Sequence, residues 1–339
     1  MKILSVIGAR PQFVKASVFR KYCSNHGVEE KLVHTGQHYD YDMSLSIFSE
    51  LGVEMPDVSI PLKNRSHGGM TGELIMKLEE IFLEERPDFV NVYGDTNSTV
   101  AAALAAVKLH IPIIHIEAGL RSFNKEMPEE VNRIITDHTS AYLFCPTHDA
   151  VMNLKREGIQ KNVYHVGDIM YDAIVAFQTL FKLPSGIKLD ESKQTAIVTL
   201  HRAETLESKE SLNEAIQYCR RFHETHNLIF PIHPNTKNRI EQYEVSTTGL
   251  QIIPPIGYLE MQGLLSEANL VLTDSGGLQK EAYFHQCDCI TLRGETEWRE
   301  TLTSGWNSLW KQPHVTNKKV KIDEYGDGDC AAKILKAIS

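Results

Sequence analysis

The chain has 339 residues, a formal net charge of -9, a hydrophobic fraction of 42% and a charged fraction of 23%. These proportions are typical of a soluble globular protein and exclude a disordered or fibrous chain. The acidic balance argues against a general nucleic-acid binder, which usually needs a concentrated basic face. Because the length exceeds one ordinary core, we expect two domains with a ligand cleft between them.

The cysteine pattern and the N-terminus indicate the cellular compartment. None of the six cysteines forms a CxxC pair, and the Cys287-Asp288-Cys289 spacing does not fit a zinc knuckle. We therefore expect reduced thiols and no metal site. The apolar run at residues 3–7 is too short for a signal peptide or a membrane span. These features predict a cytoplasmic protein with no membrane or nucleic-acid partner.

Short apolar runs of strand length alternate with helix-like stretches along the whole chain. The expected strands include residues 3–7, 89–93, 113–116, 196–200, 228–232 and 270–273. Continuously apolar strands separated by helices predict parallel sheets covered on both faces, the doubly wound, Rossmann-like α/β architecture. The pattern occurs twice, so we predict domains at residues 1–170 and 171–327. A final helix at about residues 328–339 is expected to pack back on the first domain.

The first strand leads into a turn at Gly8 and then into a helix start that carries Arg10 and Lys15. Open parallel sheets bind ligands beyond the carboxyl ends of their strands, and a helix N-terminus favours phosphate. The segment is neither a Walker A motif nor a GxGxxG motif. An ordinary strand-to-helix turn with surface charges would also explain it.

Three carboxylates follow later strands of the first half. Asp95 comes after the strand at residues 89–93, Glu117 follows residues 113–116, and Glu129 lies a short distance further on. We expect all three to converge at one edge of the sheet. Clustered carboxylates raise each other's pKa values into a range that is useful for acid–base chemistry. The cluster is therefore a candidate catalytic centre.

Ordinary helix chemistry explains part of the same segments. Ser98 or Thr99 would suit the N-cap of an Ala-rich helix at residues 100–109. Glu130 would complement the dipole at the start of another helix. Capping accounts for the hydroxyl groups, but it leaves Asp95 unexplained.

Two histidines stand directly after strands of the second half. His201 follows the strand at residues 196–200, and His233 follows the strand at residues 228–232. A single histidine at such a place is more often structural. Two of them at one sheet edge favour a binding or catalytic site, although neither has metal-ligand spacing.

The strand at residues 270–273 leads into a turn with Ser275, Gly276 and Gly277, and a helix follows at once. Such a turn exposes backbone N–H groups that suit a diphosphate. Glu281, one turn into the helix, is placed to accept hydrogen bonds from a ribose diol. A plain glycine turn would explain the glycines but not this acid.

Taken together and in this order, the segments resemble the non-hydrolysing UDP-N-acetylglucosamine 2-epimerases over most of the chain. That family has the GT-B architecture, in which two Rossmann-like domains face one cleft. The matching segments are Gly8-Ala9-Arg10-Pro11, Gly94-Asp95-Thr96-Asn97-Ser98-Thr99, Glu117-Ala118-Gly119-Leu120-Arg121, Pro128-Glu129-Glu130-Val131-Asn132-Arg133, His201-Arg202 and Asp274-Ser275-Gly276-Gly277.

The resemblance implies roles for individual residues. The catalytic residues would be Asp95, Glu117, Glu129 and His201. Substrate and UDP contacts would come from Arg10, Lys15, Arg133, Met261, Ser275, Gly276, Gly277 and Glu281, to which we add His233 from its place after a strand. Met261 stands where relatives often have an aromatic beside the uracil, and a thioether can also pack on a base. Gln37 and His38 form a candidate regulatory loop.

The resemblance also implies a reaction, the inversion of C2 of UDP-N-acetylglucosamine or a related UDP-2-acetamido sugar. UDP would leave, a 2-acetamidoglycal would form, and UDP would add back, without a cofactor or metal. A homodimer that serves surface polysaccharide synthesis is expected. Residues 36–40, 122–124 and 295–298 resemble a branch that acts on 2,3-diacetamido uronates or 6-deoxy sugars. A hydrolysing 2-epimerase, a GT-B glycosyltransferase and an inactive UDP-sugar sensor are the alternatives.

Overall fold

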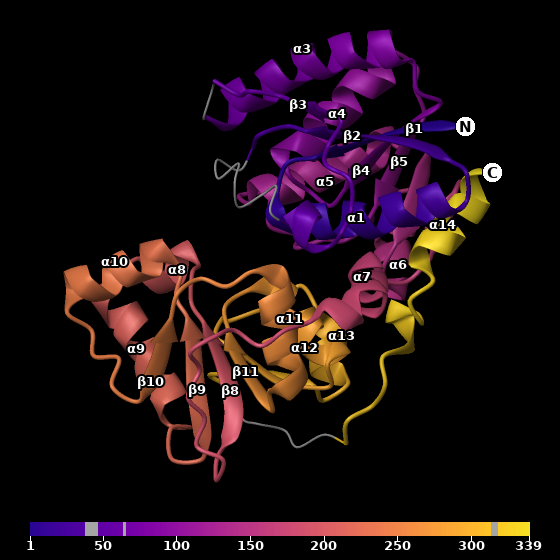
Figure 1. Cartoon of the computed structure of the whole chain (residues 1–339). Coiled ribbons are helices and arrows are strands. Elements are labelled where there is room, and N and C mark those ends of the chain that lie inside the picture. Colours follow the sequence, from indigo (N-terminus) through magenta and orange to yellow (C-terminus); the bar gives the residue numbers. More distant parts are fainter. Residues whose placement is uncertain (38–46, 64–65, 313–317) are drawn as a thin grey trace. The chain divides into compact units, whose positions relative to one another are not determined.

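The computed structural model describes residues 1–37, 47–63, 66–312 and 318–339 (Figure 1). The chain forms two compact units. The first comprises Met1–Phe177 with Asp323–Ser339, and the second comprises Gln178–Ile322. Among the described residues, no helix combines the length and apolarity needed to cross a membrane.

The first unit is built on a seven-stranded sheet in which every pair of neighbours is parallel. Its strands are β1 (Lys2–Ile7), β2 (Glu29–His34), β3 (Val58–Ser59), β4 (Phe89–Tyr93), β5 (Ile113–Ile116), β6 (Tyr142–Cys145) and β7 (Val163–His165). The spatial order is β3-β2-β1-β4-β5-β6-β7. This is the Rossmann order, in which the order of the strands along the chain reverses between β1 and β4. Folds of this kind bind ligands beyond the carboxyl ends of the strands at that point.

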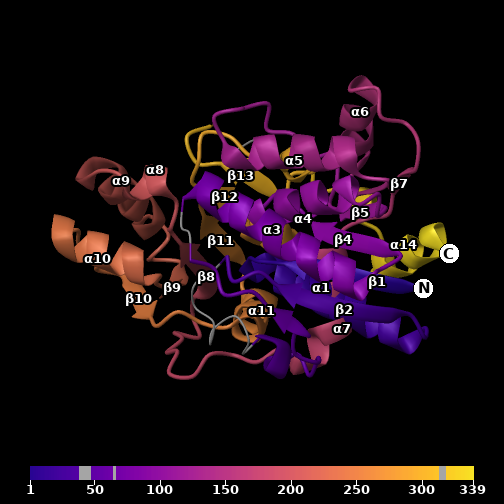
Figure 2. The same ribbon diagram turned by 90° about the horizontal axis from the view of Figure 1, so that it is seen from above.

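The helices of the first unit either connect these strands or follow the last of them. They are α1 (Arg10–Asn25), α3 (His67–Glu85), α4 (Asn97–Lys108), α5 (Pro128–Thr139), α6 (His148–Arg156), α7 (Ile169–Phe177) and α14 (Cys330–Ile338), with a 3-10 turn at Asp323–Tyr325. Helices α3, α4 and α5 lie side by side (Figure 2). Helix α1 packs against α7 and α14.

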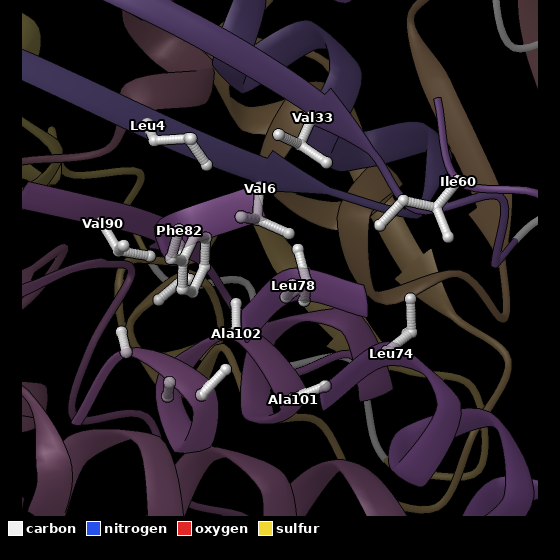
Figure 3. Packing of buried hydrophobic residues seen from close by; sticks show 14 of the residues in the cluster. Leu4, Val6, Val33, Ile60, Leu74, Leu78, Phe82, Val90, Ala101 and Ala102 are labelled. Atoms are coloured by element: carbon white, nitrogen blue, oxygen red, sulfur yellow. The ribbon is translucent and has the colours of Figure 1, made fainter. Parts of the chain in front are cut away.

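The core between the sheet and helices α3 and α4 follows from the periods of the two element types (Figure 3). Alternate residues of a strand share one face, so Leu4 and Val6 of β1 enter the same cluster. Residues four apart share one face of a helix, and Leu74, Leu78 and Phe82 of α3 meet those strand residues. The small alanines of α4 fill the remaining space.

The second unit repeats the plan with a six-stranded parallel sheet of order β10-β9-β8-β11-β12-β13. Its strands are β8 (Gln194–Thr199), β9 (His226–Pro231), β10 (Leu250–Ile253), β11 (Leu270–Thr273), β12 (Asp288–Thr291) and β13 (Asn307–Leu309). Its helices are α8 (Ala203–Leu206), α9 (Lys209–Arg220), α10 (Pro234–Tyr243), α11 (Tyr258–Glu267), α12 (Gly276–Phe284) and α13 (Arg299–Thr303), with a 3-10 turn at Gln178–Leu180.

Strand β8 shows why this sheet is covered on both faces. Ala196 and Val198 pack into one apolar cluster with Ile216 of α9. Ile197, between them in sequence, packs into a second cluster with Leu265 of α11 and Ala282 of α12. The predicted fold class, α/β with two Rossmann-like domains, is confirmed.

The start of α4 differs from one alternative considered above. The N-cap is Thr96, whose Oγ1 accepts a hydrogen bond from the backbone N–H of Thr99 at 3.2 Å. The Thr99 hydroxyl in turn accepts from the N–H of Thr96 at 3.3 Å. The assignment of the cap to Ser98 or Thr99 is therefore wrong, because the helix already begins at Asn97.

Helix α14 closes the first unit, and its N-terminus is held by Asp172 of α7. The Asp172 carboxylate accepts hydrogen bonds from the N–H groups of Cys330 at 3.0 Å and Ala331 at 2.8 Å. Burial raises the pKa of Asp172 to about 6, although these two hydrogen bonds act in the opposite direction.

Replacement of this carboxyl, Asp172→Asn, changes how stability depends on pH. The folded wild type holds a proton up to about pH 6, whereas the unfolded chain releases it near pH 3.9. Stability is therefore highest below the lower value and falls by roughly 3 kcal/mol as pH rises through this window. The Asp172→Asn variant lacks this decline. Urea denaturation of both proteins from pH 4 to 7 measures it, and identical pH slopes would contradict the assignment.

Candidate functional site

The two reversal points of strand order carry most of the predicted site residues. In the first unit, β1 ends before Gly8 and β4 ends before Gly94. In the second unit, β8 ends shortly before His201 and β11 ends directly before Asp274. Each unit therefore presents polar residues at the place where a doubly wound sheet binds ligands.

The side chain of Gln12 forms hydrogen bonds to both turns of the first unit, the one after β1 and the one after β4. Its Oε1 accepts hydrogen bonds from the N–H groups of Gly8 at 2.8 Å and Ala9 at 3.0 Å. Its Nε2 donates to the carbonyl of Tyr93 at 2.6 Å. Gln12 is buried, and the sequence analysis gave it no role. The available signal was a long polar side chain in the first turn of a helix that follows a strand.

Asp95 forms an ion pair with Arg133, which α5 supplies. Burial raises the pKa of Asp95, and the nearby charge of Glu117 acts in the same direction. Arg133 opposes this rise most strongly, and Lys15 opposes it more weakly. The carboxyl group thus titrates above its usual range while it remains paired with a cation, which suits acid–base chemistry.

Glu117 forms an ion pair with Lys15 of α1. It stands on a tight turn with φ = +70°, a left-handed conformation that costs a side-chain-bearing residue about 1–3 kcal/mol. The carbonyl of Phe144 accepts the N–H groups of both Glu117 and Ala118 at 3.0 Å and holds this turn. The backbone strain is therefore located at Glu117, the residue whose charge helps to raise the pKa of Asp95.

The adjacent acids Glu129 and Glu130 have different environments. Glu130 is buried and accepts hydrogen bonds from the N–H groups of Ser122 at 2.8 Å and Phe123 at 2.9 Å. It also pairs with Arg133 at 2.9 Å, so its role is to hold the loop before α5. Glu129 is exposed. The structure brings Asp95 and Glu117 close enough for the charge of Glu117 to raise the pKa of Asp95.

Arg10 and Gln37 lie at other points of the same unit. Arg10 begins α1 and is exposed. The Gln37 Oε1 accepts hydrogen bonds from the N–H of Ser98 at 3.0 Å and from its hydroxyl at 2.7 Å. Gln37 therefore contacts the first turn of α4. His38 lies outside the described residues.

In the second unit, His201 is held by Asp274. The His201 Nδ1 lies 3.0 Å from the Asp274 carboxylate, which also accepts hydrogen bonds from the N–H groups of His201 and Arg202 and from the Thr205 hydroxyl. Burial alone would raise the pKa of Asp274, but His201 and the backbone donors lower it. Asp274 had been given no role. Its signal was an acid directly after an apolar strand.

The turn Ser275–Gly277 starts α12. Ser275 is the N-cap, and its side chain makes no capping hydrogen bond. A Cβ at Gly276 would lie 2.3 Å from an oxygen of the Glu297 side chain, so a larger residue there would have to displace that carboxylate. The helix thus presents backbone N–H groups without a side-chain cap, which is a favourable anion site.

Three further residues were predicted to contact UDP, and each has a different environment in the second unit. Glu281 on α12 accepts a hydrogen bond from Gln262 at 2.7 Å, and the carbonyl oxygen of that amide contacts His285 at 2.8 Å. Met261 is half-buried against the cluster around Val271. His233 is the N-cap of α10, and its Nδ1 accepts from the N–H of Asn235 at 3.3 Å. Capping is thus one role of His233.

Across the described part of the chain, no three His, Cys, Asp or Glu residues are grouped so that they could hold a metal ion. All six cysteines are free and buried.

The two doubly wound sheets define a two-domain α/β protein with polar residues at the strand ends where this fold binds ligands. Residues 20–339 match the family described as UDP-N-acetylglucosamine 2-epimerase. The chain belongs to this family. Membership places it among the epimerases, which are isomerases.

Individual relatives agree with this placement. A UDP-N-acetylglucosamine 2-epimerase homolog of Methanococcus maripaludis is 44% identical over 100% of this chain and 99% of its own length. The UDP-2,3-diacetamido-2,3-dideoxy-D-glucuronate 2-epimerase of Pseudomonas aeruginosa is 46% identical over 91% of this chain and 88% of its own. The crystal structure of the Methanocaldococcus jannaschii UDP-GlcNAc 2-epimerase in complex with UDP-GlcNAc and UDP is 36% identical, with a TM-score of 0.87 over 100% and 99% of the two chains.

The environment of Asp274 yields a prediction. In Asp274→Asn, one acceptor oxygen becomes an NH2 group, so the buried donors around it lose a partner. The free energy of unfolding should fall by about 1–3 kcal/mol. Urea denaturation measures the loss. The control Asp190→Asn changes an exposed aspartate that also contacts a serine hydroxyl, and it should unfold at the wild-type midpoint. An Asp274→Asn midpoint equal to the wild type would contradict the prediction.

Proposed function

We propose that the chain inverts C2 of a UDP-2-acetamido sugar by eliminating UDP and adding it back. The observation that carries the proposal is the pair of carboxylates Asp95 and Glu117, each matched with a cation, at the reversal point of the first sheet. The helix N-terminus at Ser275–Gly277 supports it from the second unit.

The chemistry explains why both features are needed. A base takes the proton from C2, its electrons form the C1–C2 double bond, and the C1–O bond breaks with its electron pair on UDP. Return of the proton to the opposite face and attack of UDP on C1 complete the inversion. Because the C2 proton is weakly acidic, the reaction needs a positioned base and a stabilised leaving group. We assign leaving-group stabilisation to Arg10, Arg133 and the turn Ser275–Gly277.

Inversion needs proton exchange on both faces of C2, so one acid–base group is too few. Asp95 and Glu117 are the two acids that lie together, and Glu129 is the third candidate. The raised pKa of Asp95, caused mainly by burial, favours it as a group that exchanges a proton with the substrate. We assign His201, oriented by Asp274, to the same reaction. No nicotinamide is needed, because departure of UDP activates C2.

For the substrate, we propose UDP-GlcNAc or a 2,3-diacetamido uronate derivative. Two of the relatives named above act, by their names, on one or the other sugar. The Pseudomonas aeruginosa relative, at 46%, is more identical to this chain than the Methanocaldococcus jannaschii UDP-GlcNAc 2-epimerase, at 36%. We assign uridine contacts to Met261, Glu281 and His233. We further propose a cytoplasmic homodimer that supplies surface polysaccharide synthesis.

The direct test is incubation with both UDP-sugars in D2O, followed by NMR at C2. The proposal expects deuterium at C2 in a product that is still linked to UDP. Free sugar and UDP would identify the hydrolysing reaction instead, which the relatives do not favour. Retention of protium at C2 with both sugars would contradict the proposed function.

Amide replacement of the three acids gives the site prediction. Asp95→Asn, Glu117→Gln and Glu129→Gln should each lower turnover by about 10²-fold or more, because the amide can neither take nor give the proton. The control is Glu126→Gln, which changes an exposed carboxylate in the loop before α5 and should keep wild-type turnover. Near-wild-type activity in all three acid variants would rule out the assignment.

A further inference from the structure

His115 lies on β5, two residues before Glu117, and its side chain is fully buried. Its Nδ1 is 2.7 Å from the Asp137 carboxylate of α5. Its Nε2 is 2.8 Å from the carbonyl oxygen of Gly94, the residue directly before Asp95. One imidazole ring thus links the turn that carries Asp95 to a buried acid on a helix.

That buried acid also holds the turn that carries Glu117. The Asp137 carboxylate accepts a hydrogen bond from the N–H of Gly119 at 3.2 Å and from the Arg121 guanidinium at 2.6 Å. Gly119 has φ = +80°, and a Cβ there would lie 2.4 Å from the carbonyl oxygen of Ala150. The Glu117–Gly119 turn is therefore tightly constrained, with Asp137 as one of its supports.

Both partners of the His115 ring are acceptors. A backbone carbonyl has no hydrogen to give, and Asp137 is a carboxylate whose pKa is lowered by His115 and Arg121 against the effect of burial. The two short contacts are hydrogen bonds only if both ring nitrogens carry a hydrogen. With a hydrogen on each nitrogen the ring would make both bonds, and its charge would be compensated by the Asp137 carboxylate.

Helix α5 contributes to the same frame with several residues on one side. Asp137 follows Arg133 by four residues, so the two side chains share a face. Arg133 pairs with the Asp95 carboxylate, and Asn132 donates to the Asp95 carbonyl at 2.9 Å. Asp95 is thus held from α5 directly and, through His115, by way of Gly94.

We propose that His115 and Asp137 are positioning residues that fix the distance between the Asp95 and Glu117 carboxylates. The inference rests on the proposed function, because it assigns to this pair a purpose in proton exchange at C2. Neither residue touches the reacting atoms. We call the hydrogen-bonded pair His115–Asp137 the bridge. It keeps the Gly94–Asp95 turn and the Glu117–Gly119 turn in a single arrangement.

The bridge has a kinetic signature. Loss of the His115 ring removes both hydrogen bonds. Loss of the Asp137 charge leaves a doubly protonated ring without compensation, so either change loosens the link between the two turns. A displacement of about 1 Å in a catalytic group costs on the order of 10²-fold in rate. The loss should appear in kcat, whereas KM should change little, because the turn Ser275–Gly277, to which we assign the diphosphate, belongs to the second unit.

The test compares His115→Phe, Asp137→Asn and the double variant in the full-length protein. Each single variant should lower kcat about tenfold to 10²-fold, and the double variant should lose no more than the worse single one, since both break one bridge. The control Asp172→Asn makes the same change at another buried aspartate that accepts two backbone N–H groups, and it should keep the wild-type kcat. Wild-type kcat in the folded single variants, or losses that multiply in the double variant, would overturn the proposal.

A second measurement is independent of turnover. Nitrogen-15 NMR of the wild-type histidine rings, with the His115 signals identified by their absence in His115→Phe, should show both ring nitrogens protonated. One unprotonated nitrogen would overturn the bridge whatever the turnover of the variants. If the wild type exchanges no proton at C2 but both ring nitrogens are protonated, the proposed function fails and the structural bridge stands.

Discussion

Two carboxylates lie at the edge of the first sheet, and each is compensated by a cation. Removal of one partner from a buried ion pair typically costs several kcal/mol, because the other charge remains without compensation. Lys15 and Arg133 must therefore stay where α1 and α5 place them. In α5, Glu130, Asn132 and Asp137 all serve to hold the same region.

The second unit has the same topology and also compensates the charge of a carboxylate at the end of a strand. Asp274 follows β11 as Asp95 follows β4, with one residue between Asp95 and its strand. Its charge is met by backbone N–H groups and by His201 rather than by an arginine or lysine. The N-terminus of α12 begins two residues later without a side-chain cap. One unit thus keeps acids near cations, and the other keeps donors available for an anion.

The sequence was most informative where local patterns decide the structure. Uninterrupted apolar runs predicted the strands at residues 89–93, 113–116 and 270–273 with the bounds that the structure has. The polar residues after those strands were predicted because parallel strands end at one edge. Partners from distant segments could not be predicted. Gln12 contacts Tyr93, and Asp137 contacts His115, through geometry that only the assembled sheet creates. Glu129 and Glu130 are adjacent in sequence, and only the packing of the preceding loop separates their environments.

In the proposed reaction, the paired acids exchange the C2 proton while the bond between C1 and UDP is broken. The most direct measurement is positional isotope exchange with a UDP-sugar that carries oxygen-18 in the bridge between C1 and the β-phosphate. If UDP departs and returns, the label moves into the non-bridging positions of that phosphate, together with deuterium uptake at C2 in D2O. Deuterium uptake with the label still entirely in the bridge would contradict the account.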